Sequence, residues 1–177
     1  KDGPLTSKLK KIKIGDEIIM IPKSTGTLVL DALKPGKRLF LLSSGTGFAP
    51  FAALIREPET YERFDSIVVT HTCRMVNELS YSQSIIQECK NDELVKEFID
   101  NKLLSYHSTT RDDYVFNGRI TELILSNKIF NDLKLNPISY DDRFMFCGSM
   151  GLNNDLKKIM LEKKFREGAN NHPGEFV

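Results

Sequence analysis

Residues 38–50 read RLFLLSSGTGFAP and join an apolar run, a turn with two glycines and the start of a helical stretch. The apolar run has the composition of a strand that is covered on both faces. Gly45 and Gly47 let the backbone turn tightly and approach a ligand closely, and Pro50 fits the first turn of a helix, where its missing N–H removes no hydrogen bond. This strand, turn and helix start predict a binding site for the diphosphate of a nucleotide.

The match to the dinucleotide-binding fingerprint GxGxxG is incomplete, because Pro50 occupies the third glycine position. Glycines are also common between strands and helices that bind nothing. A simple strand-to-helix connection therefore remains an alternative at this stage.

The alternation of apolar strands with helical stretches continues beyond this corner. It predicts an α/β fold, a doubly wound five-stranded parallel sheet. We expect strands at 38–43, 66–71, 103–108 and 143–147, a fifth strand starting at 175–177, and helices at 49–55, 80–89, 93–99, 120–125 and 152–165.

The residues before position 36 follow a different pattern. Helical spacing of Leu5, Leu9 and Ile12 predicts a short helix over 8–14, and two β-rich runs at 17–22 and 27–31 are arranged like a hairpin. Two strands alone form no stable sheet. We therefore interpret 1–35 as the C-terminal remnant of a β-domain and 36–177 as the α/β domain.

Three arginines follow the predicted strands. Arg74 comes after the second strand, where an NAD-specific site usually offers a carboxylate to the ribose. Arg111 and Arg119 follow the third strand, and Thr110 adds a hydroxyl beside them. Guanidinium groups bind phosphate through two parallel hydrogen bonds, so this set favours NADP over NAD. Solvated surface arginines are the alternative interpretation.

The last predicted strand ends in Cys147, Gly148 and Ser149. Ligands of doubly wound sheets lie at the carboxyl ends of the strands, so these residues are expected to border the nicotinamide beside Thr46. A buried structural cysteine is the alternative for Cys147.

The composition excludes several classes of protein. The net charge of +1 provides no field for nucleic acid or anionic membranes, and no apolar run reaches membrane-spanning length. Cys73, Cys89 and Cys147 form no disulfide framework or zinc motif, which favours a reducing cytoplasm. His71 and Cys73 lack further ligands at metal-binding spacing, so no metal is expected.

Several motifs together resemble the ferredoxin NADP reductases, and more narrowly their bacterial ferredoxin or flavodoxin type. The resemblance spans nearly the whole chain and rests on residues 45–51 (GTGFAPF), 147–149 (CGS), 23–31 (KSTGTLVLD), 71–74 (HTCR) and 166–170 (REGAN). It implies an FAD-binding antiparallel β-barrel, whose last elements are residues 1–35, followed by an NADP-binding domain.

The resemblance also implies an activity and a set of residue roles. FAD passes electrons between NADP(H) and ferredoxin or flavodoxin, in an enzyme that we expect to be a monomer. Thr6 and Ser7 match a segment that contacts the FAD diphosphate. Arg74, Thr110, Arg111 and Arg119 match contacts of the 2′-phosphate, and Thr46 and Cys147 match residues near the nicotinamide. A reductase component for another acceptor, such as an oxygenase, and a non-catalytic nucleotide-binding module are the alternatives.

Overall fold

The computed structural model describes residues 3–20, 22 and 26–177. Its centre is a four-stranded, all-parallel sheet in the order β3-β2-β1-β4. The strands are β1 (Arg38–Ser44), β2 (Ser66–Cys73), β3 (Leu103–Thr109) and β4 (Asp142–Cys147). The four predicted strands are thus confirmed within two residues at each end.

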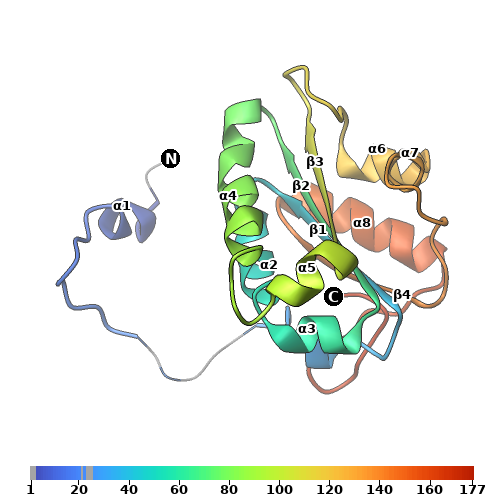
Figure 1. Cartoon of the computed structure of the whole chain (residues 1–177), viewed down its shortest axis with the longest axis horizontal. Helices are drawn as coiled ribbons and strands as arrows, with labels where there is room; N and C mark the ends of the chain where they lie inside the picture. Colours follow the sequence, from blue (N-terminus) through green and yellow to red (C-terminus); the bar gives the residue numbers. More distant parts are fainter. Residues whose placement is uncertain (1–2, 21, 23–25) are drawn as a thin grey trace.

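Helices cover both faces of this sheet, as Figure 1 shows. Alternate residues of β1 separate the two cores: Leu39 and Leu41 pack under one layer, and Phe40 and Leu42 under the other. The first layer contains α2 (Phe48–Leu54), α3 (Pro58–Arg63), α4 (Ser80–Cys89) and α5 (Lys96–Lys102), and the second contains α6 (Ile120–Leu125), α7 (Lys128–Asp132) and α8 (Met150–Glu162).

The strand order places a topological switch point between β1 and β4. The chain runs outward from β1 through β2 to β3 and then returns to the other side of β1 as β4. The connections that follow β1 and β4 therefore leave on opposite faces of the sheet, and a crevice opens between them at the carboxyl ends of the strands. The doubly wound α/β prediction is confirmed by this topology.

The prediction of five strands is wrong, because the sheet has four. Residues 175–177 do lie beside β4. The amide of Phe144 donates to the carbonyl of Glu175 at 3.0 Å, and the amide of Val177 donates to the carbonyl of Phe144 at 3.0 Å. This contact forms only an isolated parallel bridge between Phe144 and Phe176, which is too short for a strand.

The predicted hairpin is also wrong within the described residues. Residues 17–20 and 26–29 form no strand, and the second run ends in the 3₁₀ helix η1 (Leu30–Ala32). Residues 21 and 23–25 of that prediction lie outside the described residues. Within the described residues no strand lies beside 17–20 or 26–29, where a two-stranded ribbon alone would be unstable, and Ile18 and Ile19 are 63% and 101% exposed.

The predicted helix over 8–14 is shorter and earlier than expected. Helix α1 spans Thr6–Leu9, and none of its residues is buried. Figure 1 shows α1 standing apart from the sheet and its helices. Without an apolar partner a single turn gains little from lengthening, because nucleating a helix is costly and packing supplies most of its stability.

Candidate functional site

A cavity of about 690 Å³ lies at the carboxyl edge of the sheet. It reaches from the β1 and β4 corners across the ends of β2 and β3 to the first turns of α6 and α8. Its lining residues are Ser44, Gly45, Thr46, Thr72, Cys73, Arg74, Glu78, Thr110, Arg119, Ile120, Thr121, Gly148, Ser149, Gly151, Leu152 and Asp155.

The glycine corner after β1 forms one wall of this cavity. Gly45 has φ +52°, in the left-handed region that glycine adopts without steric penalty. A Cβ atom at Gly47 would overlap the carbonyl group of Cys147, so this loop touches the end of β4. Pro50 lies in the first turn of α2, as predicted, but outside the cavity lining.

The corner after β4 forms the adjoining wall. A Cβ atom at Gly148 would overlap the hydroxyl of Ser44, so the two corners touch again. Ser149 caps α8, because its hydroxyl oxygen accepts a hydrogen bond from the amide of Leu152 at 3.3 Å. The two predicted loops therefore meet at the switch point.

Thr46 and Cys147 differ in their access to the cavity. Thr46 is exposed and belongs to the lining. Cys147 is half-buried beside the first core and is not among the lining residues. Burial raises the pKa of the Cys147 thiol above its usual value, so at neutral pH this thiol stays protonated and is a poor nucleophile.

The predicted phosphate-binding residues are largely brought together. Arg74, Thr110 and Arg119 line the cavity, whereas Arg111 does not. Arg111 is nevertheless a neighbour, because its amide donates to the carbonyl of Arg74 at 3.0 Å. All three arginines are exposed, and the ion pairs found in the described part of the chain include none of them.

Backbone hydrogen bonds hold the loop that carries Thr110 and Arg119. The amide of Thr110 donates to the carbonyl of Cys73 at 3.0 Å, which ties the loop to the end of β2. The amide of Gly118 donates to the carbonyl of Thr109 at 2.9 Å, and Gly118 has φ +129°. The arginine side chains are thus presented from a fixed backbone.

Sequence reasoning missed Glu78, which lines the same cavity. Its Oε2 atom accepts hydrogen bonds from the amides of Arg74 and Met75, both at 2.9 Å. These bonds hold the pKa of Glu78 below its usual value, so the carboxylate is ionised at neutral pH. The available signal was its position four residues after Arg74, at the start of a helical stretch.

Sequence reasoning also missed the contact of His71 with the glycine corner. His71 is 2% exposed. Its Nε2 lies 2.8 Å from the Gly45 carbonyl oxygen, and its Nδ1 lies 2.7 Å from the Ser82 hydroxyl. Burial lowers the pKa of His71, an effect that the bond to Gly45 only partly opposes. The signal was a histidine on the strand next to a glycine turn.

Thr6 and Ser7 are not brought to this cavity. Their hydroxyls lie 3.5 Å from the Gly3 carbonyl oxygen and 3.4 Å from that of Pro4, within their own helical turn. Across 3–20, 22 and 26–177, no group of three or more His, Cys, Asp or Glu is placed to hold a metal ion. Within the same residues, no helix is long and apolar enough to cross a membrane.

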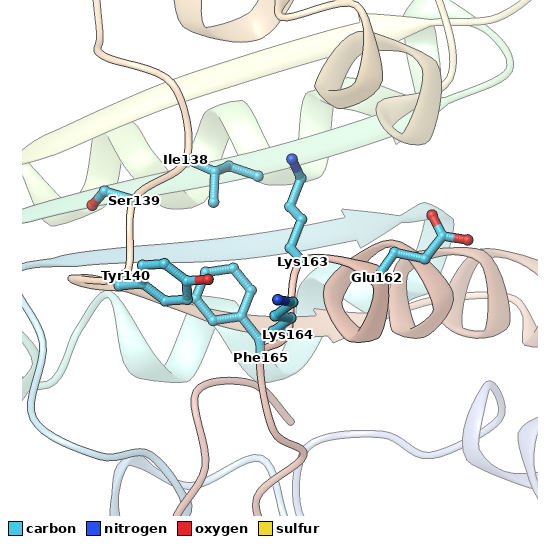
Figure 2. Close-up of a pocket in the computed structure, with 7 residues that line it drawn as sticks. All are labelled: Ile138, Ser139, Tyr140, Glu162, Lys163, Lys164 and Phe165. Carbon is cyan, nitrogen blue, oxygen red and sulfur yellow. The ribbon is translucent and has the colours of Figure 1, made fainter.

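A second cavity, of about 290 Å³, lies at the amino edge of the sheet (Figure 2). Two lysines and the rings of Tyr140 and Phe165 border it, and the ring centroids are 5.6 Å apart. It lies between the loop before β4 and the end of α8. Its lining residues are Ile138, Ser139, Tyr140, Glu162, Lys163, Lys164 and Phe165.

Fold and site together define a class of protein: a doubly wound α/β domain with a cavity suited to a phosphorylated ligand at its switch point. No family model matches the chain, but individual relatives do. A flavodoxin/ferredoxin–NADP reductase from Rhodobacter capsulatus is 49% identical over 177 residues, covering 99% of this chain and 66% of the relative. A ferredoxin–NADP reductase from Sorangium cellulosum is 42% identical, covering 99% of this chain and 64% of the relative.

The chain is also similar in structure to solved proteins. A ferredoxin NADP⁺ reductase from Neisseria gonorrhoeae with bound FAD and NADP superposes with a TM-score of 0.83 at 26% identity, covering 100% of this chain and 69% of that one. The human Ncb5or CS-b5R domains share the fold, with a TM-score of 0.67 at 18% identity over 99% of this chain and 45% of that one.

This chain belongs to the ferredoxin (flavodoxin) NADP reductase family, and its α/β part has the fold of that family's NADP-binding domain. It spans slightly less than two thirds of the length of the two curated relatives described above.

Proposed function

We propose that this chain supplies the NADP(H) site of an FAD-dependent enzyme that transfers electrons between NADP(H) and ferredoxin or flavodoxin. The observation that carries the proposal is the joint presence of Arg74, Thr110 and Arg119 in one cavity with Gly45 and Thr46 of the glycine corner. A basic end and a backbone-lined end match the two phosphorylated parts of NADP.

The basic end is proposed to bind the 2′-phosphate of NADP. Arg74 follows the end of β2, and Arg119 directly precedes α6. Thr110 adds a hydroxyl donor, and Arg111 lies at the rim of the cavity. The exposure of the arginines without ion pairs in the described residues supports this role, since their guanidinium groups are available to phosphate. The Thr110 hydroxyl, 3.4 Å from the Cys73 carbonyl oxygen, would exchange this partner for phosphate.

The other end is proposed to bind the diphosphate and the nicotinamide. Gly45, Thr46 and Gly47 form the diphosphate corner, with Pro50 fixing the start of α2 behind it. Gly148 and Ser149, at the adjoining corner, are proposed to border the nicotinamide together with Thr46 and Cys147. A protonated Cys147 thiol suits a packing role beside the ring rather than covalent chemistry.

The redox chemistry is supplied by the bound cofactors, since nicotinamide exchanges a hydride and flavin also exchanges single electrons. The residues of this chain contribute binding and orientation of the nucleotide. No side chain of the cavity is required as acid or base for that task.

The segment 1–35 is proposed to be the end of an FAD-binding barrel, with Thr6 and Ser7 at the FAD diphosphate, and 36–177 to be the NADP(H)-binding domain. Exposed apolar side chains support this division. Leu5, Ile14, Ile19 and Met20 are between 66% and 108% exposed, as expected of residues that pack against a further domain.

The decisive experiment replaces Arg74 by alanine in the full-length protein and measures kcat/KM for NADPH and for NADH. We expect the preference for NADPH to fall by about 10- to 100-fold, the loss of one charge-assisted contact to phosphate. Arg56→Ala is the matched control, because Arg56 pairs with Glu88 away from the cavity. An unchanged preference in Arg74→Ala would refute the assignment.

Assays with purified acceptors address the rest of the proposal. Faster turnover with ferredoxin or flavodoxin than with an oxygenase component supports the proposed partners, and the reverse favours the reductase component of an oxygenase. A protein without flavin absorbance favours a non-catalytic module. The proposal includes a monomer. It also includes a reducing cytoplasm, which the three free cysteines support.

A further inference from the structure

His71 connects the glycine corner to the neighbouring strand and helix. It lies on β2, is 2% exposed and contacts Gly45 on one side and Ser82 of α4 on the other, with the Sγ atom of Cys73 at 3.2 Å from its Nε2. Ser82 is itself completely buried. The ring is therefore clamped between two elements and has little freedom to rotate.

The chemistry of its partners fixes the protonation of the ring. A carbonyl oxygen only accepts hydrogen bonds, so the 2.8 Å contact with Gly45 requires a hydrogen on Nε2. In the neutral ring Nδ1 is then an acceptor, and the Ser82 hydroxyl at 2.7 Å is its donor. Ser82 has the carbonyl of Leu79 at 2.9 Å as an alternative acceptor, so this donor is shared.

The bond to Gly45 also determines where the next amide points. A trans peptide is planar, and its C=O and N–H groups point in opposite directions. Because the Gly45 carbonyl points inward to the buried ring, the amide of Thr46 points outward, on the side where Gly45 and Thr46 line the cavity. The inward bond thus turns a hydrogen-bond donor toward the ligand side.

Without this bond the Gly45 carbonyl keeps only a weaker interaction with the Cys73 thiol, and the peptide flips more easily. Gly45 lacks a Cβ, has φ +52° and has no atom within 4 Å of the position that a Cβ would occupy. Glycine tolerates the dihedral change of a peptide flip at little steric cost. The conformational freedom of Gly45 allows the tight turn, but it does not determine which way the Gly45–Thr46 peptide points.

We propose that His71 is a positioning residue for nucleotide binding, which holds the Gly45–Thr46 peptide with its amide toward the diphosphate of NADP(H). The inference rests on the proposed function, because it assigns the diphosphate to this corner. His71 touches no nucleotide itself. Its effect on the phosphate passes through one peptide group.

The test uses two substitutions in the full-length protein, each of which retains the hydrogen bond of only one of the two ring nitrogens. In His71→Gln the side-chain amide reaches the position of Nε2 and keeps a donor for Gly45. In His71→Asn the amide corresponds to Nδ1, keeps a partner for Ser82 and removes the imidazole donor to Gly45, which leaves the weaker Cys73 thiol as the donor near that carbonyl. Both remove the aromatic ring, and Asn is one methylene smaller than Gln, so a second ligand is needed to separate lost packing from the lost donor.

Calorimetric titrations with NADP⁺ and with adenosine 2′-monophosphate provide the readout. His71→Asn should weaken NADP⁺ binding about tenfold, and His71→Gln should bind within about threefold of wild type. Adenosine 2′-monophosphate lacks the diphosphate, so its affinity should be unchanged in both variants. A purely structural role would weaken both ligands and both variants alike.

Two results would overturn the inference alone: wild-type NADP⁺ affinity in His71→Asn, or an equal loss in both variants. If the wild-type protein binds neither nucleotide, the proposed function fails and the inference fails with it.

A measurement on the wild-type protein covers the case in which a variant does not fold. Nitrogen-15 NMR should find the proton of neutral His71 on Nε2, and the Thr46 amide resonance should shift when NADP⁺ binds. A proton on Nδ1, or a Thr46 amide that does not respond to saturating NADP⁺, contradicts the proposal.

Discussion

The arginines at the two edges of the sheet have opposite surroundings. At the amino edge, Arg38 forms two hydrogen bonds to the carboxylate of Asp142, at 2.9 and 2.7 Å, and two more to backbone carbonyls. Arg143, also at this edge, is 8% exposed and donates to carbonyl groups of Lys34, Pro35, Tyr140 and Asp142. At the carboxyl edge, Arg74, Arg111 and Arg119 are exposed and have no ion pair within the described residues.

The difference separates two uses of the same side chain. A guanidinium group whose donors are already satisfied inside the protein holds the fold together and has little left for a ligand. One that is presented from a fixed backbone without an internal partner is available for phosphate. The following predictions test whether stability and nucleotide binding divide along these two edges.

The largest effect is expected from Asp142→Ala at the amino edge. The Asp142 side chain is 2% exposed, and its loss leaves Arg38 without its carboxylate in a site where only 13% of the arginine side chain is exposed. Urea unfolding should report a loss of about 3–5 kcal/mol, as for other broken buried pairs. NADP⁺ affinity at temperatures where the variant is folded should stay the same.

Asp141→Ala is the matched control for this prediction. Asp141 pairs with Lys37 at 3.0 Å, but both side chains are more than half exposed, so water replaces the interaction at little loss. A similar destabilisation by both substitutions would mean that burial does not distinguish these pairs.

Mild acid should lower the stability of the protein through two buried histidines in the carboxyl half of the sheet. Burial, assisted by the charge of His71, lowers the pKa of His107 to about 4, and burial lowers that of His71. In the unfolded chain these histidines take up protons near pH 6.5, whereas in the folded chain they do so only at lower pH. The free energy of unfolding is therefore highest above pH 6.5 and decreases as the pH falls below it.

Urea unfolding at pH 7 and pH 5 measures this decline, for which we expect about 2 kcal/mol from His107. His107→Asn should reduce the difference in the free energy of unfolding between the two pH values. Equal unfolding free energies at both pH values in the wild-type protein would contradict the assignment.

The smallest effects should rank the arginines of the carboxyl edge against one another. Arg119 lines the cavity and Arg111 does not. Arg119→Ala should weaken NADP⁺ binding about tenfold and Arg111→Ala about two- to threefold. Neither should change stability appreciably, since both side chains are exposed. A larger loss from Arg111 would mean that the ligand lies farther along the rim than the cavity suggests.

The strands and several helices were predictable because apolar runs mark the strands and apolar residues at helical spacing mark the helices. The predicted helices at 80–89 and 120–125 match α4 and α6 residue for residue. Helices α3 and α7 were missed because each has few apolar residues and shows no clear period, and α7 follows Asn127 with φ +59°; α6, equally short, has Ile120, Leu123 and Ile124 at helical spacing. The hairpin was mispredicted because β-propensity in 17–31 finds no partner strand in the described residues.

The candidate site was predictable where function leaves a local pattern. Glycines before a helix and arginines after strands are visible in sequence, and most of them line the cavity. His71 and Glu78 were not assigned to it, because their importance comes from hydrogen bonds to the backbone of residues 45, 74 and 75. Such bonds depend on how strands and loops are brought together, which no local pattern encodes.

The mutual contact of the two glycine corners has a consequence for the shape of the crevice. Gly47 lies against the carbonyl of Cys147, and Gly148 lies against Ser44, so each loop fills the space that a side chain on the other would need. The loops at 44–47 and 147–148 are in direct contact. A side chain added at either glycine would therefore push directly on the opposite loop, so the shape of the crevice between β1 and β4 depends on both glycines at once.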